Sequence, residues 1–424
     1  MKMGTVTAVT HPTNSNEGQT SAITVPIFAD AVPRSLCTDC GISRTTDHKR
    51  CGRACQFIAP DYPRLETAVH GRPRDPNKTD ELHFGPFRRM VRAELRRPSD
   101  GAQWTGITSR IGERLLETGA VDAVLTMASD PDDRWKPVPV IVTRSEDMAA
   151  CRGMKMGYAP LLALLEPARD AGHKRIALIG IPCQVYALRA LEAELGFDKV
   201  FVIGTPCSDN TTTERFHQFL DLVAQDIGQA PADITYLEFR ADYQVEVRFS
   251  GGGKREIPFL MLPISKLPPD FFPVTCRTCG DYTNVLADIT VGYMGGEGHQ
   301  WLIIRNERGE ELIGLLGDEV AAAEPGSRGN RKSAVEGFAK NVALAAGGLP
   351  VNRMPAWLKP IVAWAMPRFG PRGLEFARAR VEMKAVETVL HLRREEPARM
   401  RSMIPAHVWA LASRYGIAPR DGER

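Results

Sequence analysis

Eight of the nine cysteines fall into two groups whose positions suit metal ligation. The first group spans nineteen residues in the pattern C-x2-C-x10-C-x3-C and consists of Cys37, Cys40, Cys51 and Cys55. Four thiolates this close along the chain can surround one metal centre at a small cost in loop-closure entropy. Structural zinc also takes four cysteines, so the spacing favours an iron–sulfur cluster and leaves zinc open as the alternative.

The second group is dispersed along the chain. Cys183 follows a predicted strand in GIPCQ, Cys207 follows the next strand in GTPCSDN, and Cys276 and Cys279 form CRTC. Taken singly, such cysteines are more often inert and buried. The carboxyl ends of neighbouring parallel strands meet at one crevice, however, so these four thiols predict a second metal centre. Cys151 has no partner by spacing and is expected to serve packing only.

Two clusters predict a protein that handles electrons one at a time. Reducing a carbon–carbon or carbonyl bond needs two electrons together, and a flavin is the usual cofactor that makes the conversion. The sequence contains neither G-x-G-x-x-G at a strand-to-helix turn nor G-x-x-x-x-G-K-[ST]. It therefore predicts neither a Rossmann nicotinamide site nor a phosphate-binding P-loop.

Composition and charge limit the partners and the location. With 54 basic and 51 acidic residues, the net charge of +3 gives no reason to expect nucleic-acid binding. The first 35 residues lack the basic start and apolar core of a secretory signal, so we expect a cytoplasmic protein with reduced thiols. The apolar segment Trp357–Phe369 is too short to span a membrane. It predicts a buried helix, with shallow peripheral membrane contact as the alternative.

Alternating patterns predict the elements that must position these cysteines. Helices are expected over 107–117, 161–171, 184–195 and 213–227. Strands are expected over 121–127, 138–143, 175–180 and 199–203. This alternation is typical of an α/β fold with a mostly parallel sheet core. Strands over 234–239 and 245–249, followed by the turn at 250–253, add a β-meander layer.

The pattern divides the chain into five segments. They are a flexible arm (1–34), an N-terminal iron–sulfur loop region (35–90), an α/β flavin-binding core (91–232), a β-rich region with the second cysteine motif (233–330) and a C-terminal helical region (331–424). A linker is expected within the last segment, over 347–355.

Several long phrases resemble a known family. Four phrases resemble, in their order along the chain, the family of coenzyme F-420 hydrogenase/dehydrogenase beta subunits, which are iron–sulfur flavoproteins. The phrases are QWTGITSRIGERLLETGAVDAV, GIPCQVYALRAL, GTPCSDNTT and CRTCGDYTNVLADITVGYMG. The resemblance runs from about Leu36 to Tyr415. Three further phrases look like one branch of this family, which contains the ferredoxin-dependent divinyl chlorophyllide 8-vinyl reductase and 7-hydroxymethyl chlorophyll a reductase. They are CGDYTNVLADITVGYMGG, IIRNERGEEL and GLEFARARVEMKAVETVLHLRR.

The resemblance implies FAD, two 4Fe-4S clusters, electrons from reduced ferredoxin and a tetrapyrrole substrate. The implied oxidoreductase reaction, part of (bacterio)chlorophyll biosynthesis for photosynthesis, reduces the 8-vinyl group of divinyl chlorophyllide or protochlorophyllide to ethyl. Alternatives are 7-hydroxymethyl chlorophyll a reduction, a coenzyme F-420 oxidising beta subunit of a hydrogenase or dehydrogenase, and a zinc-bearing scaffold without a substrate pocket. The implied location is cytoplasmic, with contact to a photosynthetic membrane as the alternative. One departure concerns the first cluster: relatives have a third cysteine close after the first pair, where this chain has Ile42 and Ser43 and supplies Cys51 instead.

The resemblance also implies two flavin-contacting segments. Their residues are Thr105, Gly106, Ile107 and Thr108 in the first segment, and Arg152, Gly153 and Lys155 in the second. A glycine-containing turn that opens a helix offers backbone N–H groups to a pyrophosphate, and a lysine offers a countercharge. The alternative for Lys155 is a solvated surface lysine.

The proton donor cannot be identified from the sequence. Asp281, Tyr282 and Glu297 are candidates because they lie near the second cysteine motif. Asp288 precedes an apolar strand and is expected to be structural, with flavin ribityl hydroxyls as its alternative partners.

A basic stretch offers one place for ferredoxin to dock. It contains Arg88, Arg89, Arg92, Arg96 and Arg97 and is expected to span about two helical turns. Complementary charge would speed the encounter with an acidic ferredoxin, although a solvated helix face is the simpler interpretation.

Overall fold

The computed structural model describes residues 23–26, 36–58, 60–240, 242–295, 297, 299–345 and 354–424. Most of the predicted arm and residues 347–353 of the predicted linker lie outside the described residues. Within the described ranges, no helix combines the length and apolarity needed to cross a membrane.

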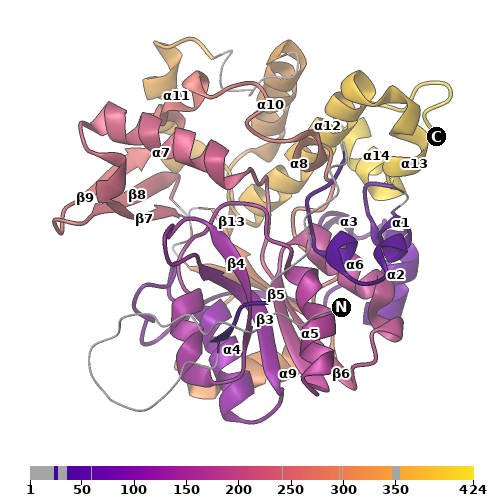
Figure 1. The fold of residues 1–424 in the computed structure, drawn as a ribbon. Helices are drawn as coiled ribbons and strands as arrows, with labels where there is room; N and C mark the ends of the chain where they lie inside the picture. Colours follow the sequence, from indigo (N-terminus) through magenta and orange to yellow (C-terminus); the bar gives the residue numbers. More distant parts are fainter. Residues whose placement is uncertain are drawn as a thin grey trace.

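A nine-stranded mixed sheet forms the centre of the molecule (Figure 1). Its order is β1-β4-β3-β5-β6-β10-β11-β2-β12. The strands are β1 (Ile23–Thr24), β2 (Arg89–Leu95), β3 (Ala123–Ser129), β4 (Pro137–Val142), β5 (Arg175–Gly180), β6 (Lys199–Gly204), β10 (Ile289–Tyr293), β11 (Gln300–Ile304) and β12 (Val320–Ala323). The four central strands β3, β5, β6 and β10 pair in parallel, and the outer strands pair antiparallel. The predicted α/β class with a mostly parallel core is confirmed.

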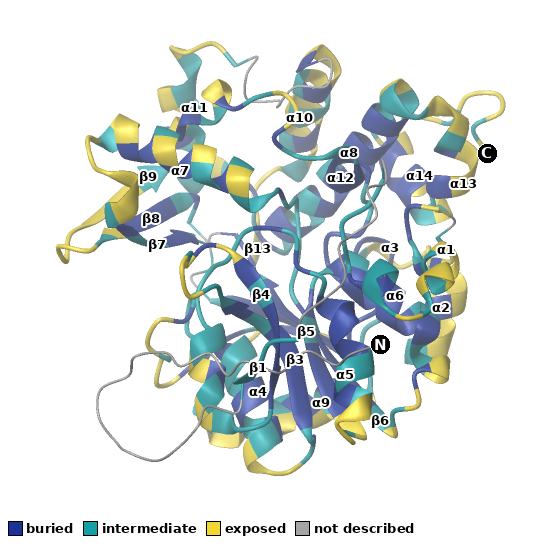
Figure 2. Ribbon diagram, in the orientation of Figure 1, coloured by how far each residue is buried: buried dark blue, intermediate teal, exposed yellow. Residues whose placement is uncertain are grey.

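Helices cover both faces of this sheet, which explains its continuous apolar strands. In β5, Ile176 and Leu178 enter one buried cluster while Ala177 enters the other. The helices α5 (Leu165–Asp170) and α6 (Pro182–Leu191) pack on the first face, and α4 (Ile107–Glu117) and α9 (Glu307–Gly314) pack on the second. Strands that are buried on both faces are typical of parallel sheets. Figure 2 shows these strands as the buried centre of the fold.

The predicted β-meander forms a separate three-stranded sheet. It consists of β7 (Ile234–Phe239), β8 (Gln244–Phe249) and β9 (Lys254–Pro258) in consecutive order. Helix α7 (Thr213–Ile227) packs on it, because Phe216 and Val223 of the helix share a buried cluster with Leu237 and Val245 of the strands. This layer lies at one side of the main sheet (Figure 1).

The two ends of the chain meet around one long helix, α12 (Leu374–Glu395). The remaining helices are α1 (Cys51–Ala54), α2 (Tyr62–His70), α3 (Thr79–Phe84), α8 (Val274–Arg277), α10 (Arg331–Ala345), α11 (Leu358–Phe369), α13 (Met400–Met403) and α14 (Ala406–Ser413). Two short strands, β13 (Ser327–Arg328) and β14 (Arg372–Gly373), pair beside α12. Helix α12 contacts α3, α8, α10 and α14, so it joins the N-terminal region to the second cysteine motif.

Three predictions about local structure need correction. The basic stretch forms strand β2 instead of the expected helix. Buried Val91, Ala93 and Leu95 alternate with less buried positions, and a period of two is typical of a strand. Its first arginines are also neutralised, because Arg88 pairs with Glu307 at 3.0 Å and Arg89 with Glu310 at 2.7 Å.

The other two corrections concern helices. The helix expected over 161–171 begins as a 3-10 turn, Leu161–Leu164, and continues as α5. The segment expected to be a buried helix is a helix, α11, but four of its large apolar side chains face solvent. Apolar composition predicts burial only when the fold supplies a partner surface, and here the described part of the chain leaves one face uncovered.

Candidate functional site

The first four cysteines lie in a loop that ends in α1 and is fixed to the main domain. The N–H of Leu162 donates to the carbonyl oxygen of Cys40 at 2.9 Å. Gly41 follows with a φ of 111°, and a Cβ there would lie 2.4 Å from the backbone nitrogen of Ala163. Only glycine fits this close approach, so the residue after the first pair holds the loop in place.

The four thiols of this loop share one small region. Burial raises the pKa of Cys40 far above its ordinary range, and negative charge on Cys55, Cys51 and Cys37 would raise it further. The N–H of Asp39 also donates to Sγ of Cys37 at 3.3 Å. Each of the other three thiols is therefore near enough to act electrostatically on Cys40, and we call these four predicted ligands the first quartet.

The second quartet is assembled from three separate parts of the chain. Cys183 lies in the first turn of α6, after β5, and Cys207 follows β6. Cys276 lies in α8 and Cys279 just after it. Burial raises the pKa of Cys207 far above its ordinary range. Negative charge on Cys276, Cys183 and Cys279 would raise this pKa further. Because β5 and β6 are parallel neighbours, their carboxyl ends bring the dispersed cysteines to one place.

The two quartets are neighbours. The side-chain amide of Gln56, next to Cys55, donates to Sγ of Cys279 at 3.5 Å. Burial raises the pKa of Cys183 far above its ordinary range, and negative charge on Cys40 would raise that pKa further. A hydrogen bond with the Thr38 side chain has a smaller, opposite effect. Residues within the first cysteine loop thus contact the second set of thiols directly.

The surroundings of the second quartet favour bound thiolates. Burial raises the pKa of Cys276 to about 12 and that of Cys279 to about 11, so free thiolates are disfavoured there. The N–H of Asn210 donates to Sγ of Cys276 at 3.4 Å, the type of contact that stabilises charge on cluster sulfur. Across the described ranges, no three His, Cys, Asp or Glu side chains form a site for a single metal ion.

A buried lysine supplies positive charge at the second quartet. The Lys384 side chain on α12 is 3% exposed and donates to the carbonyl oxygen of Cys276 at 2.7 Å. It also pairs with Asp209 at 3.0 Å and with Glu387 at 2.9 Å. Its charge lowers the pKa values of Cys276 and Cys279 against the larger effect of burial. A site built for anionic sulfur fits a cluster ligated by four thiolates.

The sequence offered one usable signal for this lysine. Position 384 lies on the same helical face as buried Ala377, Val381 and Thr388, where an unpaired lysine would be costly. We did not predict Lys384, because helical periodicity shows that a residue faces inward without showing what it meets.

The two segments implied to bind flavin lie together at the start of α4. Gly106 precedes the helix with a φ of 93°. The hydroxyl of Thr105 donates to Oε1 of Gln300 at 2.9 Å, and the same oxygen accepts from the N–H of Ile107 at 3.3 Å. Gly153 lies beside Gly101, where an added Cβ would lie 3.3 Å from the carbonyl oxygen. Thr108 belongs to the first turn of α4.

The charged side chains of the second segment are engaged within the protein. Arg152 pairs with Glu113 of α4 at 2.7 Å. Lys155 is half-buried and donates to the carbonyl oxygens of Cys151 at 2.9 Å and of Arg152 at 2.7 Å. Desolvation lowers the pKa of Lys155 to about 8. Its ammonium is therefore held by backbone carbonyl oxygens of its own segment.

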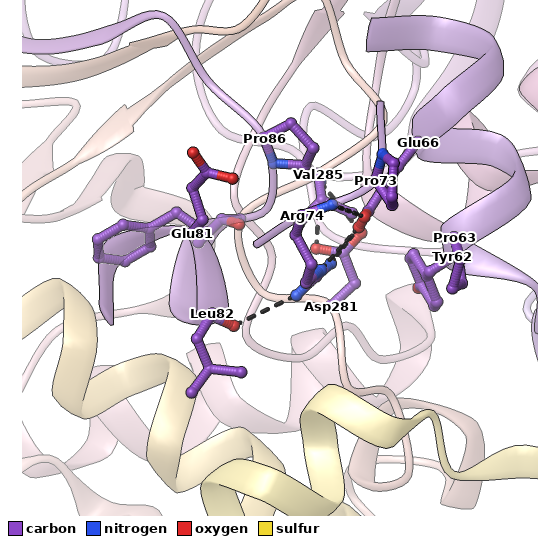
Figure 3. Close-up of polar contacts among 12 residues, drawn as sticks. Tyr62, Pro63, Glu66, Pro73, Arg74, Glu81, Leu82, Pro86, Asp281 and Val285 are labelled. Atoms are coloured by element: carbon purple, nitrogen blue, oxygen red, sulfur yellow. Dashed lines mark hydrogen bonds and ion pairs between the residues drawn. The ribbon is translucent and has the colours of Figure 1, made fainter. Parts of the chain in front are cut away.

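The three candidate proton donors do not converge. Asp281 is buried and accepts from the N–H of Val285 at 3.2 Å, near the ion pair of Arg74 with Glu66 (Figure 3). Burial raises the pKa of Asp281 to about 6. Figure 3 shows its carboxylate beside Arg74, among residues of the N-terminal region.

Tyr282 and Glu297 lie in different surroundings from Asp281. The Tyr282 ring is buried, and the guanidinium of Arg380 lies 5.8 Å from its centroid. Glu297 accepts from the N–H of Gly326 at 2.9 Å, which ties it to a loop before β13. Tyr282 and Asp281 both adjoin the second quartet through their backbones: the carbonyl oxygen of Tyr282 accepts from the N–H of Cys207 at 3.0 Å, and that of Asp281 lies 3.7 Å from Sγ of Cys279.

A group of aromatic rings near these residues was not predicted. The rings of Trp104 and Tyr293 are nearly parallel, with an interplanar angle of 8° and centroids 6.3 Å apart. Phe376 of α12 meets Tyr293 edge-on at 5.0 Å and Tyr243 at 5.4 Å. Trp104 directly precedes the first flavin segment. Its aromatic neighbours lie far away in sequence, so only the fold shows that they belong together.

Asp288 is structural, as expected. It is fully buried and forms ion pairs of 2.8 Å with Arg189 of α6 and with Arg308 of α9. Its second oxygen accepts from the N–H of Val202 at 2.7 Å. These partners occupy both carboxylate oxygens.

Comparison with known proteins adds to this geometry. Models of the coenzyme F420 hydrogenase/dehydrogenase beta subunit match residues 90–166 with their N-terminal part and 173–324 with their C-terminal part. An uncharacterized protein of Nostoc sp. is 34% identical over 91% of this chain and 94% of its own. The 7-hydroxymethyl chlorophyll a reductase of Oryza sativa is 33% identical over 89% and 82%, respectively.

Two further similarities involve proteins named for coenzyme F420. One component of the F420H2 dehydrogenase of Methanosarcina mazei is 31% identical over 53% of this chain and 62% of its own length. A chain in the structure of the F420-reducing [NiFe] hydrogenase complex from Methanosarcina barkeri superposes with a TM-score of 0.50. That match covers 59% of this chain and 84% of the other at 22% identity, and it supports the fold.

Proposed function

Because this chain belongs to the family of coenzyme F420 hydrogenase/dehydrogenase beta subunits, in the branch that includes a chlorophyll reductase, we propose that it reduces a chlorophyll-type tetrapyrrole. The specific reaction we propose is reduction of the 8-vinyl group of divinyl chlorophyllide or protochlorophyllide to ethyl, with reduced ferredoxin as the electron donor. The observation that carries the redox part is the pair of adjacent cysteine quartets.

The cysteines would hold two 4Fe-4S clusters, and the residues around α4 would hold FAD. When bound, these groups supply single-electron transfer and the electron pair that saturating a vinyl group requires. The short connection through Thr38 and Gln56 keeps the two quartets in contact. The Lys384 ammonium offsets negative charge at the second quartet, and Asn210 donates to its sulfur.

The chain itself would orient the pigment and keep water away. The aromatic rings of Trp104 and Tyr293, backed by buried Phe376, pack next to the first flavin segment, and we propose that they contact the flat conjugated ring of the pigment. Among the candidate donors, Tyr282 is favoured to deliver a proton, because its side chain lies beside the second quartet and Arg380. Asp281 and Glu297 are engaged elsewhere by Val285 and Gly326.

The decisive experiment is anaerobic. The reconstituted protein is mixed with reduced ferredoxin and divinyl chlorophyllide, and the pigment is identified by absorption and mass. We expect a blue-shifted Soret band and a gain of two hydrogens, because saturating the vinyl group shortens the conjugated system. An unchanged pigment beside a demonstrably reduced flavin would refute the 8-vinyl assignment.

A second candidate follows from the relative in Oryza sativa, which is named for 7-hydroxymethyl chlorophyll a. The same assay with that pigment separates the two reactions, because its reduction removes an oxygen and leaves the vinyl group intact. Oxidation of reduced coenzyme F420 together with co-purifying subunits would instead favour a beta-subunit role like that of the methanogen relatives.

Metal content tests the quartets separately from the substrate. We expect iron and acid-labile sulfide, with no stoichiometric zinc. Cys276→Ala should lose one of two clusters, whereas Cys151→Ala should keep both, since Cys151 belongs to neither quartet. Zinc without iron would favour the scaffold alternative.

A further inference from the structure

Helix α11 carries a surface that the proposed reaction does not use. Seven large apolar side chains are exposed in the described part of the chain, and four of them lie in or beside this helix. Trp357 is 71% exposed, Ile361 54%, Trp364 55% and Phe369 70%. Such a concentration of exposed rings on one short element marks an interaction surface.

The exposed side chains share one face of the helix. Trp357, Ile361 and Trp364 follow one another at spacings of four and three residues, which places them in a row. Ala363 faces the opposite way and is buried, on the side where the helix meets the turn Phe259–Met261. The row therefore points away from the protein, and Figure 2 shows exposed positions along α11 at the edge of the molecule.

The charged residues along this segment of the sequence have one sign. Between Leu344 and Leu374 the sequence contains Arg353, Lys359, Arg368 and Arg372 but no aspartate or glutamate. The Arg368 guanidinium lies 4.6 Å from the centroid of the Trp364 ring, so a positive group is held at the edge of the apolar row. Elsewhere the chain mixes both signs, with 54 basic and 51 acidic residues in total.

We propose that α11 binds the surface of an anionic lipid bilayer, with Trp357, Ile361 and Trp364 inserted among the headgroups. Arg368, held beside the Trp364 ring, would then meet lipid phosphates. Tryptophans beside basic residues on a helix too short to span are typical of helices that lie in the membrane interface.

A second copy of the chain fits this face less well. A two-fold contact through α11 would place the basic groups of one copy against those of the other, with no acidic partner on either helix. An anionic bilayer supplies the missing negative charge. A bilayer is also where an apolar pigment would be held. The inference therefore adds to the proposed function, but it does not depend on that function.

The test uses the full reconstituted protein and flotation with vesicles, without pigment or reductant. We expect binding to phosphatidylcholine vesicles that contain phosphatidylglycerol and much weaker binding to phosphatidylcholine alone. The double variant Trp357→Ser with Trp364→Ser should bind at least about tenfold more weakly. Arg368→Gln, which removes one positive charge beside the apolar row, should weaken binding by about fivefold.

The matched control is Ile58→Ser, which removes an exposed apolar side chain far along the chain from α11. It should bind vesicles like the unaltered protein, and iron and flavin content should be unchanged in every variant. Equal flotation of the double-tryptophan variant would overturn the proposal. The proposal would also be overturned if the unaltered protein did not bind vesicles and instead self-associated through these tryptophans in sedimentation velocity.

Discussion

Lys384 shows what a single buried residue contributes to the site. A lysine with 3% of its side chain exposed is costly unless partners hold it, and here Asp209, Glu387 and the carbonyl oxygen of Cys276 do so. The same ammonium lies near two thiols of the second quartet and lowers their pKa values. We therefore assign Lys384 a positioning and electrostatic role, with no contact to substrate.

Lys384→Met is expected to lower the midpoint potential of the neighbouring cluster, because a positive charge favours the reduced, more negative form. The loss of one nearby charge is worth on the order of 2 kcal/mol, or roughly 90 mV for one electron. Redox titration followed by electron paramagnetic resonance measures the shift. Lys384→Arg keeps the charge and should stay close to the unaltered potential; equal potentials for both variants would contradict this role.

At the scale of elements, one buried carboxylate joins three pieces of the core. Asp288, at the start of β10, pairs with Arg189 of α6 and Arg308 of α9 and accepts from Val202 of β6. Helix α6 begins at the turn that carries Cys183, so this network fixes the helix behind the second quartet. Burial by itself would raise the pKa of Asp288, but Arg189, Arg308 and the hydrogen bonds to its carboxylate together hold that pKa below its ordinary value.

Asp288→Asn is expected to lower the free energy of unfolding by about 3–5 kcal/mol, because it removes the fully buried counterion of Arg189 and leaves that buried arginine with Glu192 alone. Chemical denaturation measures the change. Asp170→Asn is the control: its pair with Arg169 is 71% exposed at the aspartate, and such pairs contribute less than about 1 kcal/mol. A similar, small effect of both substitutions would show that the network adds little.

At the scale of the whole molecule, buried neutral histidines make the fold sensitive to acid. Burial lowers the pKa of His70 to about 3 and that of His391 to about 3, and it lowers the pKa of His407 well below its ordinary value. One nitrogen of His70 lies 2.8 Å from the carbonyl oxygen of Val285, and the other lies 3.4 Å from the side-chain amide of Asn306. The neutral ring satisfies both, donating to the carbonyl and accepting from the amide.

Because the pKa of His70 is depressed, its contribution is complete above about pH 6.5 and is lost as the pH falls toward 3. At pH 5 this one group should cost about 2 kcal/mol of stability relative to pH 7.5. His70→Gln should narrow the difference between denaturation midpoints at these two pH values. An unchanged difference in this variant would refute the assignment.

Local periodicity was enough to predict most of the core. The helices Ile107–Glu117 and Thr213–Ile227 and the strands Arg175–Gly180 and Ile234–Phe239 have the predicted bounds. Their patterns are unambiguous because each element buries a regular face. The prediction of a helix at strand β2 was wrong, because it rested on the arginines and not on the alternating Val91, Ala93 and Leu95.

The sequence alone predicted which residues could do the chemistry. Clustered cysteines after glycine-containing turns, and long phrases shared with a family, pointed to both quartets and to the flavin segments. These signals are local, because ligand type and turn conformation depend on residues that are neighbours in the sequence.

The surroundings of those residues became visible only in the folded chain. The contacts of Gln56 with Cys279 and of Lys384 with Cys276 join positions more than a hundred residues apart. The parallel grouping of Trp104 with Tyr293, and the exposure of α11, likewise depend on which surfaces the fold covers. Which partner a buried side chain meets, and which apolar face stays uncovered, are properties of the packed chain, so periodicity along the sequence did not show them.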